Sequence, residues 1–91
     1  MHIFWSPEAI GDFSAIFEFI SRDNASAAIK VVDKIYDAIE SLPTFPKLGK
    51  SGRLGNTREL VLAPLPHIVV YRLKGTTIEI VRILHGSQKW P

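Results

Sequence analysis

The last third of the chain holds three β-rich runs that are separated by short turn signals. Valine, isoleucine, leucine and tyrosine recur in these runs, which predicts strands over residues 57–63, 67–73 and 77–85. The linkers Ala63–Pro66 and Lys74–Thr76 are too short for a crossover, so neighbouring strands are expected to be antiparallel. An antiparallel meander at the end of a short chain limits the fold more than any other feature of this sequence.

A strand and a helix are predicted ahead of the meander. The apolar run over residues 2–5 predicts the strand, and the helix follows over residues 7–22. Ser6 is of a type that caps helix N-termini, and Pro7 suits the first helical position. Apolar side chains at three-to-four-residue spacing predict that one face of this helix is buried. These side chains are Ile10, Phe13, Ile16 or Phe17, and Ile20.

A second amphipathic helix gives the clearest periodic signal in the chain. Asn24 or Ser26 can cap its start, and it runs to about Ser41 because Pro43 ends it. Its apolar positions recur at spacings of four, three, four and three residues. They are Ala28, Val32, Ile35, Ile39 and Leu42. Since only a short link separates the two helices, we expect an antiparallel helical hairpin.

The element order β-α-α-β-β-β predicts an α+β fold in which the N-terminal helical hairpin packs on a small antiparallel sheet. Residues 1–91 are too few for a second core, so one domain is expected. Residues 43–56 are rich in proline and glycine and are expected to form a loop. The sheet face away from the helices is expected to be partly open and to carry basic side chains.

Charge is unevenly divided along the chain. Residues 1–42 hold seven acidic and three basic side chains, whereas residues 43–91 hold two acidic and eight basic ones. A basic surplus on the β-rich half indicates an anionic partner, such as nucleic acid or an acidic protein segment. A solvated surface with one sign in excess is an equally weighted alternative.

Several kinds of site and location are excluded by composition. The chain has no cysteine, which rules out disulfides, thiolate metal sites and thiol catalysis. Its three histidines lack metal-ligand spacing, so we expect neither a metal nor a cofactor. There is no signal-peptide pattern and no apolar run of the roughly 18–20 residues that span a bilayer. We therefore expect a cytoplasmic protein without membrane contact.

Four segments together resemble the RelE/ParE superfamily, the toxins of type II toxin–antitoxin modules. They are Ser6–Ala9, Thr57–Val61, Ile68–Arg72 and Ile83–Pro91, and the resemblance covers essentially the whole chain. It implies one of two activities: RelE-like members cleave mRNA in the ribosomal A site, and ParE-like members poison DNA gyrase. It also implies a cognate acidic antitoxin, through which alone the toxin would reach operator DNA.

Two departures from the RelE pattern favour the ParE-like branch. RelE-type ribonucleases carry an arginine where this chain has Ile68, and a tyrosine near the end of the tail, where this chain runs from His85 to Trp90 without one. The resemblance therefore favours a toxin that inhibits gyrase and is not itself an enzyme. A metal-independent endoribonuclease is the alternative, with Arg58, Arg82 and His85 as catalytic candidates.

Basic and tail residues are the candidates for contact with a target or an antitoxin. Arg58, Arg72 and Arg82 lie in three different strands and could converge on one face, where they would bind carboxylate or phosphate. Alternatively, each pairs with Glu59, Glu79 or a helix acid. Arg58 and Glu59 should point to opposite faces because they are adjacent. The full candidate set is Lys47, Lys50, Arg53, Arg58, Arg72, Arg82, His85, Gln88, Lys89 and Trp90.

The remaining histidines and tryptophans have structural as well as functional interpretations. His85 could transfer protons near neutral pH, or it could anchor the tail through backbone hydrogen bonds. His67 is expected to be a turn residue because it follows Pro66. Trp5 is expected to be packed. Docking of Trp90 on the protein's own sheet is favoured over stacking on a partner.

Overall fold

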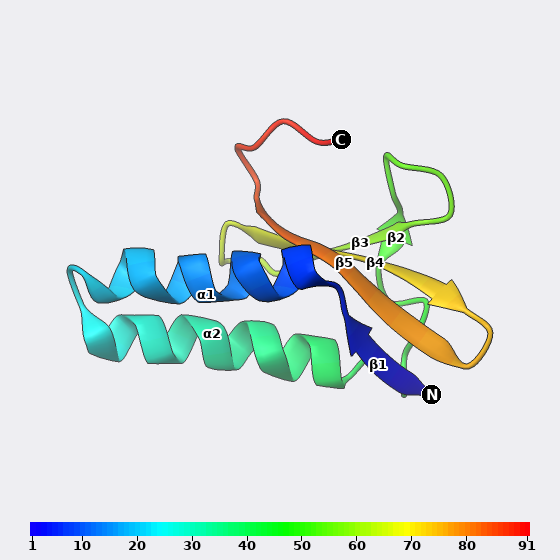
Figure 1. The fold of residues 1–91 in the computed structure, drawn as a ribbon, viewed down its shortest axis with the longest axis horizontal. Helices are drawn as coiled ribbons and strands as arrows, with labels where there is room; N and C mark the ends of the chain where they lie inside the picture. The colour runs from blue at the N-terminus through cyan, green and yellow to red at the C-terminus, as the bar shows by residue number, and fades with distance from the viewer.

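A helical hairpin and a five-stranded sheet make up the protein in the computed structural model, which describes residues 1–91. In chain order the elements are β1 (His2–Trp5), α1 (Pro7–Ser21), α2 (Ala25–Glu40), β2 (Lys50–Ser51), β3 (Arg58–Val61), β4 (His67–Lys74) and β5 (Thr77–His85). The hairpin lies on one side of the sheet, and the C-terminal tail rises on the other (Figure 1). The α+β class is confirmed. Neither helix has the length and apolarity needed to cross a lipid bilayer.

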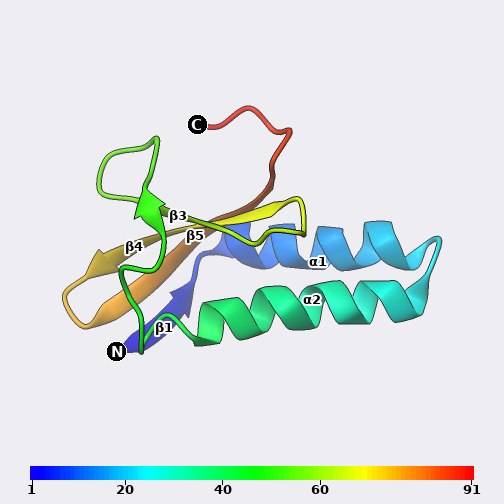
Figure 2. The same cartoon turned by 180° about the vertical axis from the view of Figure 1, so that it is seen from behind.

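The sheet has the strand order β1-β5-β4-β3-β2. The predicted meander is confirmed, because β3, β4 and β5 pair antiparallel in sequence order. The sheet is mixed, however, since β1 pairs parallel with β5. The two-residue strand β2 lies inside the predicted 43–56 loop and extends the sheet beyond β3, as the view from behind shows (Figure 2).

Local capping signals fix where the helices begin. The Ser6 hydroxyl accepts a 3.0 Å hydrogen bond from the Ala9 N–H and donates one of 2.8 Å to the Val81 carbonyl. It therefore starts α1 and ties that start to β5. Asn24 caps α2 by accepting a 2.9 Å hydrogen bond from the Ala27 N–H, so Asn24 rather than Ser26 is the cap.

The core forms where the inner faces of both helices meet the sheet. The periodic stripe of α2 is confirmed, because Ala28, Ile35 and Ile39 are fully buried. In α1 the stripe begins one residue earlier than predicted: Ala9 is buried, whereas Ile10 is 54% exposed. The four-three-four spacing of Ala9, Phe13, Ile16 and Ile20 fits an inward face, which turns Ile10 outward. The principal sheet residues of the core are Val69, Tyr71, Ile78, Ile80 and Ile83.

Candidate functional site

The strand register places the three strand arginines on two different sheet faces. Arg58 lies opposite Tyr71, which belongs to the core under the helices, so Arg58 is on the helix side. Arg72 lies opposite Glu79, and Arg82 lies opposite Val70. We call the other side, which carries Glu59, Val70, Arg72, Glu79 and Arg82, the open face. Arg72 and Arg82 share this face, but the predicted convergence of all three arginines is wrong.

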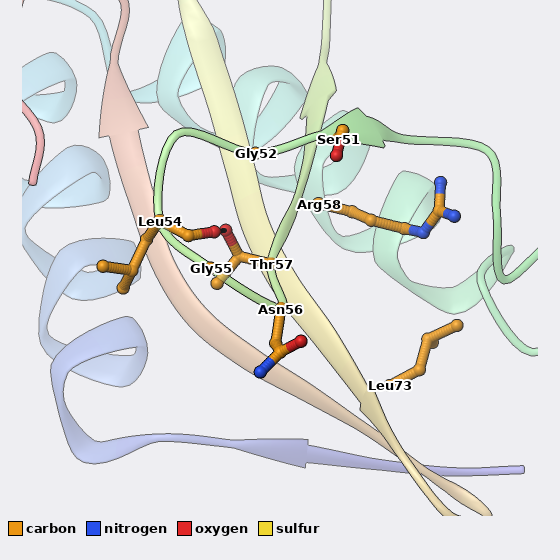
Figure 3. Close-up of a pocket in the computed structure, with 8 residues that line it drawn as sticks. All are labelled: Ser51, Gly52, Leu54, Gly55, Asn56, Thr57, Arg58 and Leu73. Atoms are coloured by element: carbon orange, nitrogen blue, oxygen red, sulfur yellow. Dashed lines mark hydrogen bonds between the residues drawn. The ribbon is translucent and has the colours of Figure 1, made fainter.

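Arg58 lines a pocket of about 370 Å³ beside the loop that joins β2 to β3, and it also holds the segment before β2. Its Nη1 donates a 2.7 Å hydrogen bond to the Gly49 carbonyl. The side chain points away from the tip of the loop that joins β2 to β3 (Figure 3). Glu59 reaches the opposite face, as the alternation of a strand requires, and this confirms the expectation for the pair.

Arg82 is clamped by Asp12, an α1 residue that the sequence analysis did not single out. Arg82 donates from Nε and Nη2 to the two Asp12 carboxylate oxygens, at 2.7 and 2.9 Å. Asp12 also accepts a 2.9 Å hydrogen bond from the Ile83 N–H, on the part of β5 that extends beyond β1. The hydrogen bond with Asp12, together with the charges of Asp12 and Glu8, raises the pKa of Arg82, although partial burial opposes the shift.

The other two ion pairs also involve arginines of the candidate set, Arg72 and Arg53. Arg72 donates from Nε to the Glu79 carboxylate across the β4–β5 pair. Arg53 binds Glu59 through Nε and Nη2, at 3.1 Å each, and through its backbone N–H at 2.8 Å. These hydrogen bonds lower the pKa of Glu59, with help from the charges of Arg53 and Lys50, although burial opposes the shift. The predicted alternative is therefore correct for Arg72 and Arg82, whereas Arg58 forms no ion pair and Glu59 pairs with Arg53 instead.

Lysines and Arg58 carry the charge in this half of the molecule that no ion pair neutralises. The side chains of Lys47, Lys50 and Lys89 are exposed, and none of them takes part in an ion pair. Lys50 lies directly opposite Glu59 at the edge of the sheet, where Arg53 already neutralises that carboxylate. The candidate set therefore divides into arginines that stabilise the fold and lysines that are free to contact a partner.

The C-terminal tail is docked through His85 and Trp90. The Ser87 N–H donates a 3.1 Å hydrogen bond to Nδ1 of His85, and the His85 N–H donates one of 2.8 Å to Oε1 of Gln88. Trp90 is half-buried, and Cζ of Arg82 lies 5.7 Å from the centre of a Trp90 ring. This geometry agrees with an anchoring role for His85 and with docking of Trp90 on the protein's own sheet.

The structure places His67 in a strand and not in a turn. It was predicted to be a turn residue, but it begins β4 and is only 6% exposed. Its ring lies edge-on to that of His85, with centroids 5.8 Å apart, and its Nδ1 is buried without a hydrogen-bond partner. Burial, followed by the charge of His85, lowers the pKa of His67. No three His, Cys, Asp or Glu side chains gather anywhere in the protein, so these two rings have no third metal ligand.

The three catalytic candidates do not come together. Arg58 lies opposite Tyr71 and His85 lies opposite His67, so the two positions are four residue steps apart along β4. This corresponds to about 13 Å along an antiparallel strand. Arg58 and Arg82 are also on different faces. No acid–base centre is formed from Arg58, Arg82 and His85 as they stand.

An apolar groove of about 340 Å³ lies between α1 and the end of β5. Ile16, Phe19, Ile20 and Ile83 line it, together with polar side chains that include His67, His85 and Gln88. Phe19 is 70% exposed, which is unusual for so large an apolar side chain. An exposed aromatic ring beside an apolar groove is typical of a surface that binds a partner helix.

Relatives in sequence indicate that the chain is a small toxin. Over 87 residues the chain is 38% identical to the putative toxin Y4kP of Sinorhizobium fredii, covering 96% of this chain and 90% of that protein. Over 86 residues it is 29% identical to toxin RelE2 of Caulobacter vibrioides, with coverage of 94% and 96%.

A family model and similar solved structures identify the family within this class. Residues 3–90 match the model of the ParE toxin of the type II toxin–antitoxin system parDE. The chain therefore belongs to the ParE toxin family, which confirms the resemblance to the RelE/ParE superfamily. A chain of the chromosomal ParDE system from P. aeruginosa superposes with a TM-score of 0.84, at 26% identity and with 93% and 95% coverage of the two chains. The YoeB–YefM complex from Staphylococcus aureus shares the fold, with a TM-score of 0.62 at 20% identity over 93% of this chain and 95% of that one.

Proposed function

We propose that this toxin inhibits DNA gyrase by binding to it and that it performs no chemistry of its own. The proposal rests on the observation that Arg58 and Arg82 bind groups of the protein itself. Arg82 is clamped by Asp12, and Arg58 holds the Gly49 carbonyl. A ribonuclease of the RelE type would need its candidate arginines, Arg58 and Arg82, free to stabilise charge on the scissile phosphate. Residues 1–91 would act as one toxin domain in the cytoplasm, where gyrase acts.

An acidic antitoxin is the proposed neutralising partner. The free charges of Lys47, Lys50 and Lys89 would attract carboxylates. The groove beside Phe19 would receive the apolar face of an antitoxin helix. The similar structures described as the ParDE system and the YoeB–YefM complex contain antitoxins, which supports a partner of this kind. Contact with operator DNA would be made through the antitoxin.

Induction of the chain in cells without its antitoxin tests this function. We expect growth arrest, a change in plasmid supercoiling and an increase in gyrase-cleaved DNA, while mRNA stays intact. Cutting of mRNA on ribosomes with no effect on gyrase would contradict the proposal. Normal growth at full expression would contradict toxicity itself.

A ribosome-dependent endoribonuclease is the second candidate function. One observation favours it: the His85 side chain is exposed at the end of β5, where RNA could reach its imidazole. In this case His85→Ala abolishes mRNA cleavage on purified ribosomes and leaves antitoxin binding intact. Absence of cleavage by the unaltered chain on programmed ribosomes eliminates this candidate.

A further inference from the structure

Four large apolar side chains of the helical hairpin are exposed to solvent. They are Ile10 and Phe17 of α1 and Ile29 and Tyr36 of α2, with exposed fractions of 54%, 38%, 52% and 48%. The two residues of each helix are seven positions apart, or about two turns, so they lie on one face of that helix. Each helix thus has a second apolar stripe beside the one that it buries in the core.

These second stripes lie on the flanks where the two helices face each other. Ile10 and Tyr36 each directly follow a fully buried residue, which is a rotation of about 100° around the helix. Because α1 and α2 are antiparallel, the same rotation on each helix turns the two side chains in opposite directions. The outer flanks are already used, since Phe19 of α1 lines the groove with β5 and Lys34 of α2 lines a groove with β3. Ile10 and Tyr36 are therefore turned toward the seam between the helices.

The exposed side chains also match in height along the hairpin. Ile10 and Tyr36 are each 13 residues from Asp23 in the link between the helices, and Phe17 and Ile29 are each six residues from it. Residues equally far from the link of an antiparallel hairpin lie at the same height. The helices lie side by side along their whole length in both views (Figures 1 and 2). The four side chains therefore form one apolar strip along the seam, which we call the seam patch.

The surroundings of the seam patch are acidic. Residues three or four positions away are the surface neighbours of a helical side chain. Asp33 is such a neighbour of both Ile29 and Tyr36, and Glu40 is one of Tyr36. Both carboxylates are exposed and take part in no ion pair. No basic residue stands three or four positions from any member of the patch, so a partner with basic side chains would match this surface.

We propose that the seam patch binds a basic amphipathic helix of DNA gyrase. The apolar face of that helix would cover the four exposed side chains and remove them from water. Its lysine or arginine side chains would lie beside Asp33 and Glu40 and bind their carboxylates. The inference rests on the proposed inhibition of gyrase and goes beyond it by naming the surface of the toxin that makes the contact and the chemistry of the segment that it binds.

A second copy of this chain and an acidic antitoxin fit the seam patch less well. A twofold axis through the patch would bring Asp33 and Glu40 of both protomers to one contact, where like charges repel. An acidic antitoxin would meet the same repulsion here, whereas the exposed lysines Lys47, Lys50 and Lys89 attract it elsewhere. A basic helix of the target is the occupant that these charges favour.

Hydroxyl-radical footprinting of the unaltered chain tests this contact without any substitution. In the free toxin Phe17 and Tyr36 should be oxidised readily, because both rings are exposed. In the complex with gyrase holoenzyme their oxidation should fall by about threefold or more, because a bound helix excludes water from the patch. Phe45, which is 59% exposed in the loop before β2, is the control and should be oxidised equally in both states. Unchanged oxidation of Tyr36 in a complex that forms would overturn the seam contact.

A pair of glutamine substitutions removes apolar surface from the seam patch. The double variant Ile10→Gln/Ile29→Gln keeps good helix formers at two half-exposed positions. We expect its affinity for immobilised gyrase to fall by about tenfold or more. Leu48→Gln/Val61→Gln is the matched control, because these residues are 55% and 51% exposed and lie outside the hairpin, and it should stay within about twofold of the unaltered chain. If the seam variant does not fold, footprinting of the unaltered chain decides.

Charge reversal at the edge of the patch tests the expected basic partner. Asp33→Lys should weaken gyrase binding by about tenfold or more, because it places a positive charge beside the bound helix. Asp37→Lys makes the same change one turn further along α2, at a position that is not three or four residues from any member of the patch, and should have a smaller effect. Equal losses for the two variants would indicate general attraction to a basic protein and would contradict binding at the seam.

The outcomes separate this inference from the proposed function. If the unaltered chain does not bind gyrase, both are contradicted. If Ile10→Gln/Ile29→Gln binds and inhibits gyrase as the unaltered chain does, the seam contact is overturned while inhibition of gyrase stands. A free toxin that sediments as a dimer, and that this double variant converts to a monomer, would show that a second copy occupies the patch and would also overturn the inference.

Discussion

The Tyr71 side chain packs directly on the backbone of Gly49. The Gly49 N–H donates a 2.8 Å hydrogen bond to the Tyr71 hydroxyl, which in turn donates one of 2.8 Å to the Pro46 carbonyl. With Arg58 on the Gly49 carbonyl, these contacts fix the loop that precedes β2. We call these three hydrogen bonds the Tyr71 latch. Since the loop carries Lys47 and leads to Lys50, the latch holds part of the proposed partner surface in position.

Gly49→Ala should destabilise the fold. A Cβ at this position would lie 2.8 Å from Cε1 and 2.9 Å from the hydroxyl oxygen of Tyr71, and 3.1 Å from backbone carbon of Glu59. We expect the free energy of unfolding to fall by about 1–3 kcal/mol, measured by urea denaturation. Gly55→Ala is the matched control, because a Cβ there meets nothing within 4 Å. Equal stability of the two variants would show that the latch is not tightly packed.

Tyr71→Phe should also be destabilising, for a different reason. It preserves the ring in the core but leaves the buried Gly49 N–H and the part-buried Pro46 carbonyl without their partner. The expected loss is about 1–3 kcal/mol in the free energy of unfolding. Tyr36→Phe removes a hydroxyl from a side chain that is 48% exposed and should change little. A loss no greater than that of the control would contradict the role assigned to the hydroxyl.

Asp12 and Arg82 should be energetically coupled. Asp12→Ala removes both oxygens that bind Arg82 and the acceptor of the Ile83 N–H, so we expect a loss of about 2 kcal/mol in stability. A double-mutant cycle with Arg82→Ala should give a coupling free energy of at least about 0.5 kcal/mol. Asp33→Ala removes an exposed α2 carboxylate outside any ion pair and serves as the control. Additive losses for Asp12 and Arg82 would contradict the clamp.

Acidification should destabilise the protein through His67. Its pKa in the folded state lies below the ordinary value near 6.5, so the unfolded chain binds the proton more readily. The contribution of neutral His67 is complete above pH 6.5 and is lost as the pH falls through the lowered pKa. We expect the thermal midpoint to drop between pH 7.5 and pH 5.5.

The variant His67→Gln isolates this effect because it cannot titrate in that range. Its thermal midpoint should depend less on pH than that of the unaltered chain. His2→Gln changes an exposed histidine at the start of β1 and should leave the pH dependence unchanged. A similar pH dependence in His67→Gln and in the unaltered chain would mean that another group is responsible.

Features that depend on neighbouring residues were predictable from the sequence. Ser6 and Asn24 cap the helices through hydrogen bonds that span three residues, and the α2 stripe reflects the geometry of a single helix. The α1 stripe was misplaced because Ala9 is small and resembles a spacer, whereas Ile10 is large. The sequence alone does not reveal which way an apolar side chain at the margin of a stripe will turn.

Features that depend on distant partners were not predictable. β1 pairs with β5, whose first paired residue, Thr77, comes after both helices, and β2 is too short to show any periodicity. The alternation of Arg58 and Glu59 was expected, but the face of each follows only from the position of Tyr71 across the strand pair. Asp12 lies 70 residues before Arg82, and nothing near either residue indicates their contact.

The most direct measurement is the supercoiling activity of purified DNA gyrase titrated with this chain. We expect the unaltered protein to inhibit gyrase without cleaving RNA, because the proposed inhibition requires contact and no proton transfer. Addition of the acidic antitoxin should restore supercoiling. Full gyrase activity at saturating toxin, together with mRNA cleavage on ribosomes that His85→Ala abolishes, would contradict the account.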